Sequence, residues 1–248
     1  MKKYFIAFLA FFSVSASVIQ TTRGQQFQNP STLVGIRVGT TLGGQSSGTT
    51  TDGTTSGLKF GILGGAQVEH WFSDNWGIGL SVLYNQKGAS ETYSEGSINH
   101  RFTDTTRNID TICSGTDDFT LNYLEIPIHL KYALGYGDVM PYVFVGPSFG
   151  LLLSGSDKTT GLISAIGDVK PFLQSLDISI DFGAGFIDHI YNGPTIFFDA
   201  GYSAGISNIY KSNPPRTVTV GGSFPNPIDH TTSKSGDIRI GLGAMWPI

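Results

Sequence analysis

The chain has 248 residues, a net charge of −4, 33 glycines and only 14% charged residues, whereas an average soluble domain carries about 25% charged residues. The low charge excludes charge-driven disorder, and the negative balance without a basic cluster argues against nucleic-acid binding. The single cysteine, Cys113, excludes an intramolecular disulfide framework and a cysteine-based zinc site. The length is common for one all-β barrel.

The first segment of the chain has the pattern of an export signal. Lys2 and Lys3 precede an apolar run over 4–12, and small residues follow. A basic start, a short apolar run and small residues are typical of a secretory signal peptide. The run is shorter than the roughly 20 residues that a transmembrane helix needs. We therefore expect a signal peptide over 1–24, cleaved after Ala16 or Gly24, and one exported domain over 25–248.

Eight later segments alternate apolar and polar side chains at every second residue, which is the period of a β-strand. The predicted strands are 33–42, 58–72, 76–88, 119–134, 140–153, 176–188, 194–207 and 236–247. In the sixth strand, Ile178 and Ile180 share one face, and Asp177 and Asp181 share the other. The fifth strand is apolar on both faces, so its sides stay unassigned.

Three features indicate that the polar face lies inside a barrel. Glycines and charges share one face, which suits a crowded polar interior. The connections alternate between short and long, as the periplasmic turns and external loops of outer-membrane barrels do. Aromatic residues lie on the apolar face at strand ends, as in an interfacial girdle. These aromatic residues are Phe72, Trp76, Tyr132 and Trp246.

The predicted fold is an all-β, eight-stranded antiparallel transmembrane β-barrel in the cell outer membrane, an up-and-down meander like OmpA and OmpX. Its sheet must close, because hydrocarbon leaves no partner for an open edge. With eight strands, side chains fill the interior, so a wide pore is not expected.

Charges of both signs on the polar face predict an ion-paired core. The predicted core residues are Arg37, Lys59, Glu69, Lys87, Glu125, His129, Lys131, Asp177, Asp181, Asp199, Asp237 and Arg239. Glu125 lies at mid-strand, four residues from His129 and six from Lys131. We expect Glu125 to form a structural ion pair, so that Glu125→Ala lowers the thermal stability of the barrel.

Several short stretches of the predicted barrel match the motifs of a known protein family. They are 86–89, 123–127 followed by Lys131 and Tyr132, 141–147, 201–202 and 205–209. Together these stretches, within 33–248, resemble the PorT-type outer-membrane β-barrel family of Bacteroidota, and the Tyr-Leu-Glu-Ile-Pro stretch at 123–127 is the most specific. The resemblance implies an eight-stranded barrel in the outer membrane of a Gram-negative bacterium, and a founding member takes part in protein secretion. Gly201 departs from the family, which often has arginine there.

Catalytic and metal-binding patterns are weak. The stretch 146–150 matches G-x-S-x-G around Ser148, but a nucleophile elbow needs a helix after the turn, and here a strand continues. The five histidines lie far apart and lack metal-ligand spacing. Asp177, Asp181 and Asp199 are expected to pair with cations inside the barrel rather than to share a catalytic proton. We expect no catalytic residue, no metal and no cofactor.

The sequence thus predicts a non-enzymatic outer-membrane barrel with a structural or accessory envelope role, which the family resemblance links to protein secretion. The expected partners are the lipid bilayer and envelope or secretion-complex proteins, with no nucleic acid. Three alternatives stay open. A narrow channel needs a wet path between the charges, a lipid-modifying enzyme needs a serine-histidine-acid cluster near the outer rim, and a soluble periplasmic barrel that binds an apolar ligand reverses the two faces.

Overall fold

A computed structural model describes most of the chain. The described residues are 31–46, 54–93, 101–104, 109–112, 115–135, 137, 139–161, 165–190, 192–211 and 234–248. The predicted signal peptide and Cys113 lie outside these residues.

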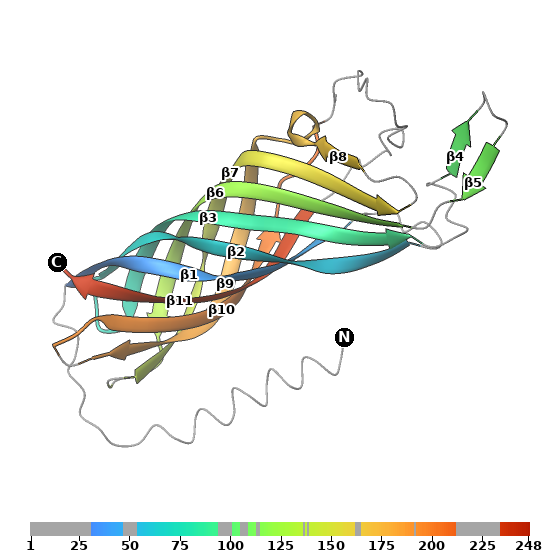
Figure 1. Cartoon of the computed structure of the whole chain (residues 1–248). Coiled ribbons are helices and arrows are strands. Elements are labelled where there is room, and N and C mark those ends of the chain that lie inside the picture. Colours follow the sequence, from blue (N-terminus) through green and yellow to red (C-terminus); the bar gives the residue numbers. More distant parts are fainter. Residues whose placement is uncertain are drawn as a thin grey trace.

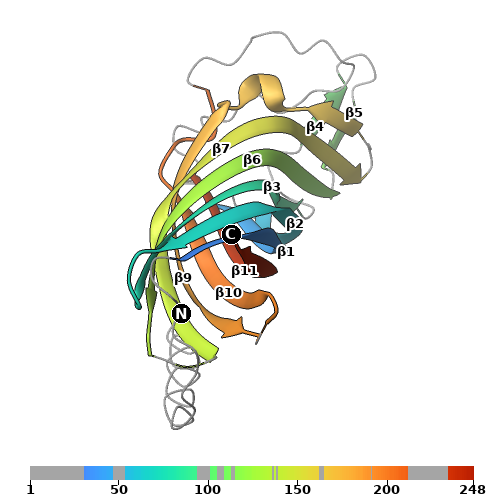
Figure 2. The ribbon, with the colours of Figure 1, turned by 90° about the vertical axis from the view of Figure 1, so that its left-hand side faces the viewer.

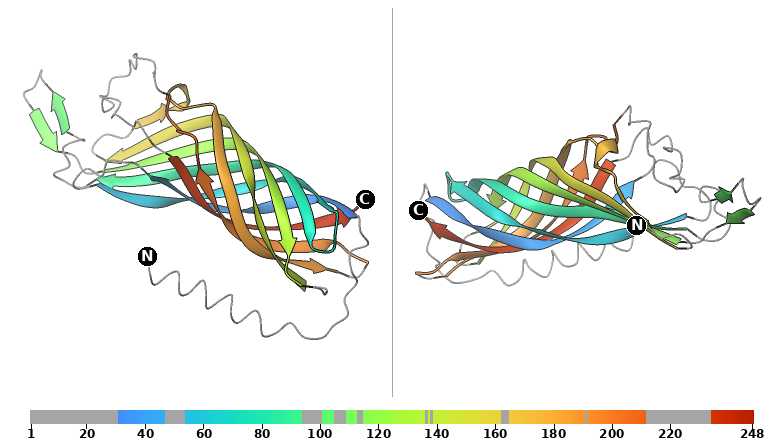
Figure 3. Two further views of the ribbon diagram at one scale, coloured as in Figure 1. Left: turned by 180° about the vertical axis from the view of Figure 1, so that it is seen from behind. Right: turned by 45° about the horizontal axis from the view of Figure 1, so that its top comes forward.

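Eight long strands close into one antiparallel ring, as predicted (Figure 1). The strands are β1 (Ser31–Ser46), β2 (Thr54–Trp71), β3 (Trp76–Tyr93), β6 (Gly115–Ala133), β7 (Val139–Gly161), β9 (Leu176–His189), β10 (Thr195–Gly205) and β11 (Lys234–Pro247). Each strand pairs with the next along the chain, and β11 pairs with β1 to close the ring (Figure 3). The predicted all-β barrel of eight strands is therefore confirmed.

The sequence did not predict three short strands and one short helix. β4 (Arg101–Asp104) pairs with β5 (Ile109–Ile112), and β8 (Ala165–Asp168) extends the sheet beside β7. A 3-10 helix spans Lys170–Phe172. These elements lie in the long connections, where no alternation of apolar and polar residues marks a strand.

The two faces of the wall have opposite chemistry. Ile36 is 58% exposed on the outside, whereas its neighbour Arg37 is only 5% exposed on the inside. The same alternation continues through β9, where Ile180 is exposed and Asp181 is buried. The apolar face is therefore outside, and the soluble barrel with an apolar interior is ruled out for this chain.

Short turns join the strands at one end. The turn after β6 contains Gly135 and Gly137, whose φ angles of 123° and 137° are unfavourable for residues with a Cβ atom. In the turn after β9, Asn192 has a φ of 53°, a conformation that asparagine tolerates better than most residues. The C-terminus lies at this same end of the barrel (Figure 1). Because outer-membrane barrels have short turns on the periplasmic side, we call this end the periplasmic end.

The wall is taller on one side than on the other. The β6–β7 pairing runs from Ala133 and Tyr142 out to Gly115 and Gly161, while β10 already ends at Gly205. The outer parts of β3, β6, β7 and β8 thus form a curved sheet beyond the barrel, which we call the outer extension (Figure 2). The predicted strands ended too early here, because polar residues on both faces of the extension break the alternation.

Glycine lets neighbouring strands approach closely in this narrow ring. A Cβ atom on Gly65 would lie 2.0 Å from the carbonyl oxygen of Val82, and one on Gly146 would lie 1.8 Å from that of Ile128. A Cβ atom on Gly183 would also meet the ring of Phe144 at 2.6 Å. The glycines therefore accommodate both the neighbouring backbone and the side chains that fill the barrel.

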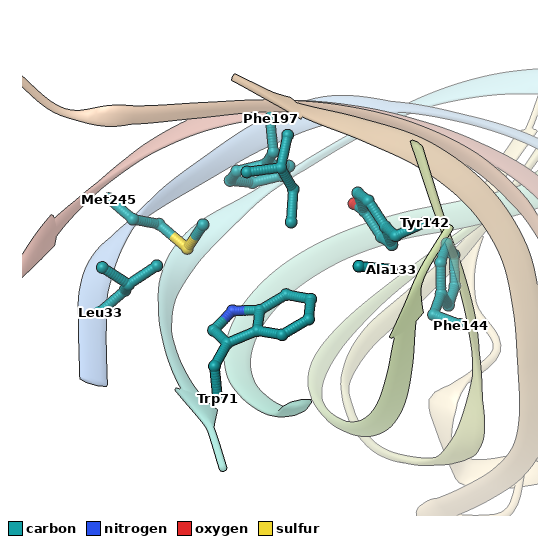
Figure 4. Close-up of a cluster of buried hydrophobic side chains, with 8 residues drawn as sticks. Leu33, Trp71, Ala133, Tyr142, Phe144, Phe197 and Met245 are labelled. Atoms are coloured by element: carbon teal, nitrogen blue, oxygen red, sulfur yellow. The ribbon is translucent and has the colours of Figure 1, made fainter. Parts of the chain in front are cut away.

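Apolar side chains fill the interior at the periplasmic end. Figure 4 shows rings and aliphatic groups from several strands pointing toward one another inside the barrel. The cluster consists of Leu33, Trp71, Ala133, Tyr142, Phe144, Ile187, Phe197 and Met245. Trp71 and Met245 are fully buried in this cluster. The sequence predicted an ion-paired core but not this apolar cluster, to which the unassigned strand β7 contributes Tyr142 and Phe144.

Candidate functional site

The structure brings eleven of the twelve predicted core residues together inside the barrel. They form two groups at different heights. The turn-side group is Arg37, Glu69, Lys131 and Asp199. The mouth-side group is Lys87, Glu125, His129, Asp177, Asp181, Asp237 and Arg239.

Lys59, the twelfth residue, lies apart from the two groups. It is half-buried near the outer extension, where its Nζ donates a hydrogen bond to Thr120 Oγ1 at 2.7 Å. The register of β2 against β3 shifts between Leu58 and Leu63, while the exposed side chains of Leu58 and Phe60 on either side of Lys59 keep the predicted alternation. No ion pair of Lys59 with the two groups is present among the described residues.

In the mouth-side group, two cations bridge the interior between strands on opposite sides. Lys87 of β3 lies 2.5 Å from Glu125, 3.3 Å from Asp177 and 3.5 Å from Asp237. Its Nζ also lies 5.2 Å from the centre of the Tyr123 ring, a cation–π distance. One lysine therefore joins carboxylates of β6, β9 and β11.

Arg239 of β11 is the second bridging cation. Its guanidinium contacts Asp237 at 2.5 Å, Asp181 at 3.0 Å and Glu125 at 3.1 Å. His129 Nε2 lies 3.1 Å from the same Asp181 carboxylate. Glu125 thus pairs with Lys87 and Arg239, whereas the sequence had placed it near His129 and Lys131 on its own strand.

The mouth-side group holds more negative than positive charge. Two cations, Lys87 and Arg239, face the four carboxylates of Glu125, Asp177, Asp181 and Asp237. Each carboxylate is at most 5% exposed, so the excess charge is buried. In this group, cations are therefore the scarce partners: there are fewer of them than carboxylates to pair with.

The turn-side group is balanced. Arg37 pairs with Asp199, which also accepts a hydrogen bond from Tyr142 Oη at 2.7 Å. Lys131 pairs with Glu69, and its Nζ lies 4.6 Å from the centre of the Tyr142 ring. This group therefore rests directly on the apolar cluster of the periplasmic end.

A second apolar cluster covers the outer mouth. Leu173 and Ile209 pack onto Leu121, Tyr123 and Leu152 of the wall. Backbone hydrogen bonds tie the two covering segments together, from Gln174 N to the Ile209 carbonyl at 2.7 Å and from Lys211 N to the Phe172 carbonyl at 3.0 Å. The charges thus lie between apolar side chains at both ends.

The four predicted girdle residues lie on the outer surface near the periplasmic end. Phe72, Trp76 and Trp246 are 43–52% exposed, and the rings of Trp76 and Tyr132 are 4.7 Å apart. Three other aromatic residues that were not predicted as interfacial, Phe60, Tyr84 and Tyr202, are also exposed.

The geometry offers little catalytic or metal-binding chemistry. Ser148 is buried in the middle of β7, so it lacks the turn and helix of a nucleophile elbow. Within the described ranges, no group of three or more histidine, cysteine or acidic residues is placed to hold a metal ion. In the same part of the chain, no helix combines the length and apolar character of a membrane span.

The outer extension carries a set of carboxylates on its concave face. Burial, together with the negative charges of Asp117 and Glu91, raises the pKa of Asp157 from 3.8 to about 6. Lys59 acts in the opposite direction and lowers this pKa. Asp157 lies beyond the last apolar outward residue of β7, Leu153, so this carboxyl is outside the membrane-spanning wall.

Comparison with known proteins agrees with this architecture. A family model described as "Outer membrane protein beta-barrel domain" matches residues 23–211. The match supports an outer-membrane barrel, and the narrower PorT-type resemblance stays a prediction. No curated protein matches the sequence significantly.

Solved structures with similar folds are distant in sequence. OprG from Pseudomonas aeruginosa is 13% identical, with 91% of this chain and 99% of that chain covered and a TM-score of 0.44. Neisserial surface protein A is 13% identical, with 86% and 97% covered and a TM-score of 0.42. Ail of Yersinia pestis, solved with the heparin analogue sucrose octasulfate, is 13% identical, with 87% and 99% covered and a TM-score of 0.38.

Proposed function

Since the chain belongs to the outer membrane protein beta-barrel domain family, we propose that it is a closed, non-enzymatic anchor with an accessory role in an envelope or protein-secretion assembly. The observation that carries this proposal is the mouth-side group of charges. Lys87 and Arg239 join carboxylates of β6, β9 and β11 across the interior. A barrel filled in this way supports an outer surface but offers no path for a solute.

The interior is unfavourable for conduction for a physical reason. An ion passing through would have to separate buried ion pairs, and separating such pairs costs several kcal/mol. The apolar clusters at the two ends add constrictions that water avoids. These features argue against a narrow channel as the main function.

Partner binding is better supported than conduction, and the outer extension is the part of the molecule that suits it. It rises from the wall as a continuation of β3, β6 and β7, so its position relative to the membrane is held by the barrel (Figure 2). Binding surfaces are common on segments that a rigid scaffold positions. We assign partner binding to the extension and to the connections at the same end.

Conductance tests the closed interior. The chain, refolded and checked by its faster gel mobility without boiling, is added to planar bilayers. The expected result is a bilayer without stepwise currents. Reproducible unitary currents from the folded fraction would overturn the proposal.

Cross-linking tests the partner surface. In a Cys113→Ser background, a photo-reactive group is attached at Lys158→Cys on the outer extension or, as a control, at Ser73→Cys in a periplasmic turn. We expect discrete adducts with envelope proteins from position 158 that position 73 does not form. If position 158 forms no adduct in intact cells, the extension is not the partner surface.

A further inference from the structure

The outward face of the barrel has a row of three small residues near the outer mouth. Gly44 of β1 pairs with Gly236 of β11, and Gly236 pairs with Ala204 of β10. The three residues therefore lie side by side across three neighbouring strands. All three belong to the face that points away from the charged interior.

Larger side chains lie next to this row, on its side toward the periplasm and at the neighbouring strand β2. The adjacent row toward the periplasm is Leu42, Ile238 and Tyr202, again paired across the same strands. Leu58 of β2 forms the wall beside Gly44, since a Cβ atom there would lie 3.2 Å from Leu58 Cδ2. The result is a hollow in the outer surface with about 950 Å³ of empty space, including the part open to the surroundings.

The Tyr202 side chain lies across Gly236, at the base of the hollow. A Cβ atom on Gly236 would lie 2.5 Å from the Tyr202 hydroxyl oxygen. The ring is also 5.9 Å from that of Phe182, which supports it from the neighbouring strand. Any larger residue at position 236 would displace this ring, so glycine keeps the hollow in its present shape.

The hollow continues the lipid-facing band of the barrel. Ile238, Ile240 and Leu242 of β11 are 37–53% exposed on the outer face, in a band that leads directly to Gly236. Lys234 follows on the same face, two residues farther out, with an exposed side chain. The apolar hollow thus has the Lys234 ammonium group at its outer edge. This edge lies at the height where lipid headgroups begin.

We propose that this hollow binds one anionic lipid of the outer leaflet. An acyl chain lies over Gly44, Gly236 and Ala204, and the lipid phosphate pairs with the Lys234 ammonium group. Because the apolar walls of the hollow face the membrane, a lipid acyl chain is always available to occupy it. The Lys234 cation at the outer edge of the hollow favours an anionic headgroup over a zwitterionic one.

Native mass spectrometry of the folded chain tests the proposal. The probes are phosphatidylglycerol and phosphatidylcholine with identical acyl chains, added together to the detergent-solubilised protein. We expect one retained phosphatidylglycerol, preferred about fivefold, which is the factor that one surface lysine contributes. Lys234→Gln should bring the preference close to one, and Ala204→Leu should lower retention of both lipids.

Two matched variants serve as controls. Lys158→Gln removes an exposed cation on the outer extension, and Ala66→Leu enlarges an outward residue elsewhere in the apolar band. Both should retain the lipid as the unchanged chain does. Lys234→Gln changes only an exposed side chain, so its result remains decisive if Ala204→Leu does not fold.

Three results would overturn the proposal. The first is no lipid retained by the unchanged chain, and the second is an unchanged preference in Lys234→Gln. The third is an equal loss in the control variants, which would mean that lipid contacts the barrel everywhere alike.

Discussion

Removing a cation from the mouth-side group should destabilise the barrel more than removing a carboxylate. Arg239→Met takes away the partner of Asp237, Asp181 and Glu125, whose contacts with it are 2.5–3.1 Å. Lys87 would then be left with Glu125, Asp177 and Asp237, and Asp181 would keep His129. Breaking a buried ion pair costs about 3–5 kcal/mol, and we expect the upper end because the excess negative charge grows.

Glu125→Gln has the opposite effect on the charge balance. Lys87 keeps Asp177 and Asp237, and Arg239 keeps its two aspartates, so no cation loses all its partners. The loss is then limited to charge-assisted hydrogen bonds, about 1.5–3 kcal/mol. Glu125→Ala also removes the acceptor of Asn85 Nδ2 at 3.0 Å, so it should be more destabilising than the glutamine variant.

The assay is urea unfolding of the refolded protein in lipid, with the folded fraction read from gel mobility without boiling. Lys158→Met, which removes an exposed cation outside the membrane, is the control and should leave the midpoint unchanged. A Glu125→Gln variant that is as unstable as Arg239→Met would refute the idea that cations are the scarce partners.

Three further predictions concern the wall and the extension. Because unfolded Asp157 releases its proton near pH 3.8 and the folded group near pH 6, stability should fall as pH rises between these values. Asp157→Asn should therefore stabilise the protein at pH 7.5 but not at pH 3, measured by urea unfolding. Gly65→Ala should cost about 1–3 kcal/mol because its Cβ atom would overlap the β3 backbone. Gly79→Ala, whose nearest atom is the flexible Lys131 Cε at 3.5 Å, should instead stabilise by about 0.5–1 kcal/mol. Trp71→Ala should cost about 3–5 kcal/mol, because the ring is fully buried.

Each of these predictions has a result that would contradict it. A pH-independent gain from Asp157→Asn would mean that this carboxyl titrates normally in the folded protein. Equal effects of the two alanine substitutions would show that strand approach does not limit residue size at Gly65. A Trp71→Ala midpoint close to that of the unchanged chain would mean that the apolar cluster at the periplasmic end contributes little.

The alternation of side chains was enough to predict the strands and the inner face. Arg37 and Ile36 illustrate why, since lipid and interior impose opposite chemistry on successive residues. The ion-pair partners were beyond this reasoning. Arg37 and Asp199 are 162 residues apart in sequence, and only the stagger of the strands around the ring brings them together.

The contacts of other residues were also beyond this reasoning. Lys59 was expected in the ion-paired core, but its Nζ donates a hydrogen bond to Thr120 Oγ1 at 2.7 Å near the outer extension. Tyr142 and Phe144 looked like part of a strand that is apolar on both faces, and their inward direction became clear only from their contacts. The unequal strand heights that form the outer extension likewise depend on pairing beyond the membrane.

Tryptophan quenching by brominated lipids tests the assignment of the two faces most directly. The chain has three tryptophans, Trp71, Trp76 and Trp246, and variants that retain one each are compared in bilayers. Trp76 and Trp246 should be quenched strongly by bromines near the headgroups, while the interior Trp71 should keep its fluorescence. Strong quenching of Trp71 together with unquenched Trp76 would contradict a charge-filled interior enclosed by a lipid-facing apolar wall.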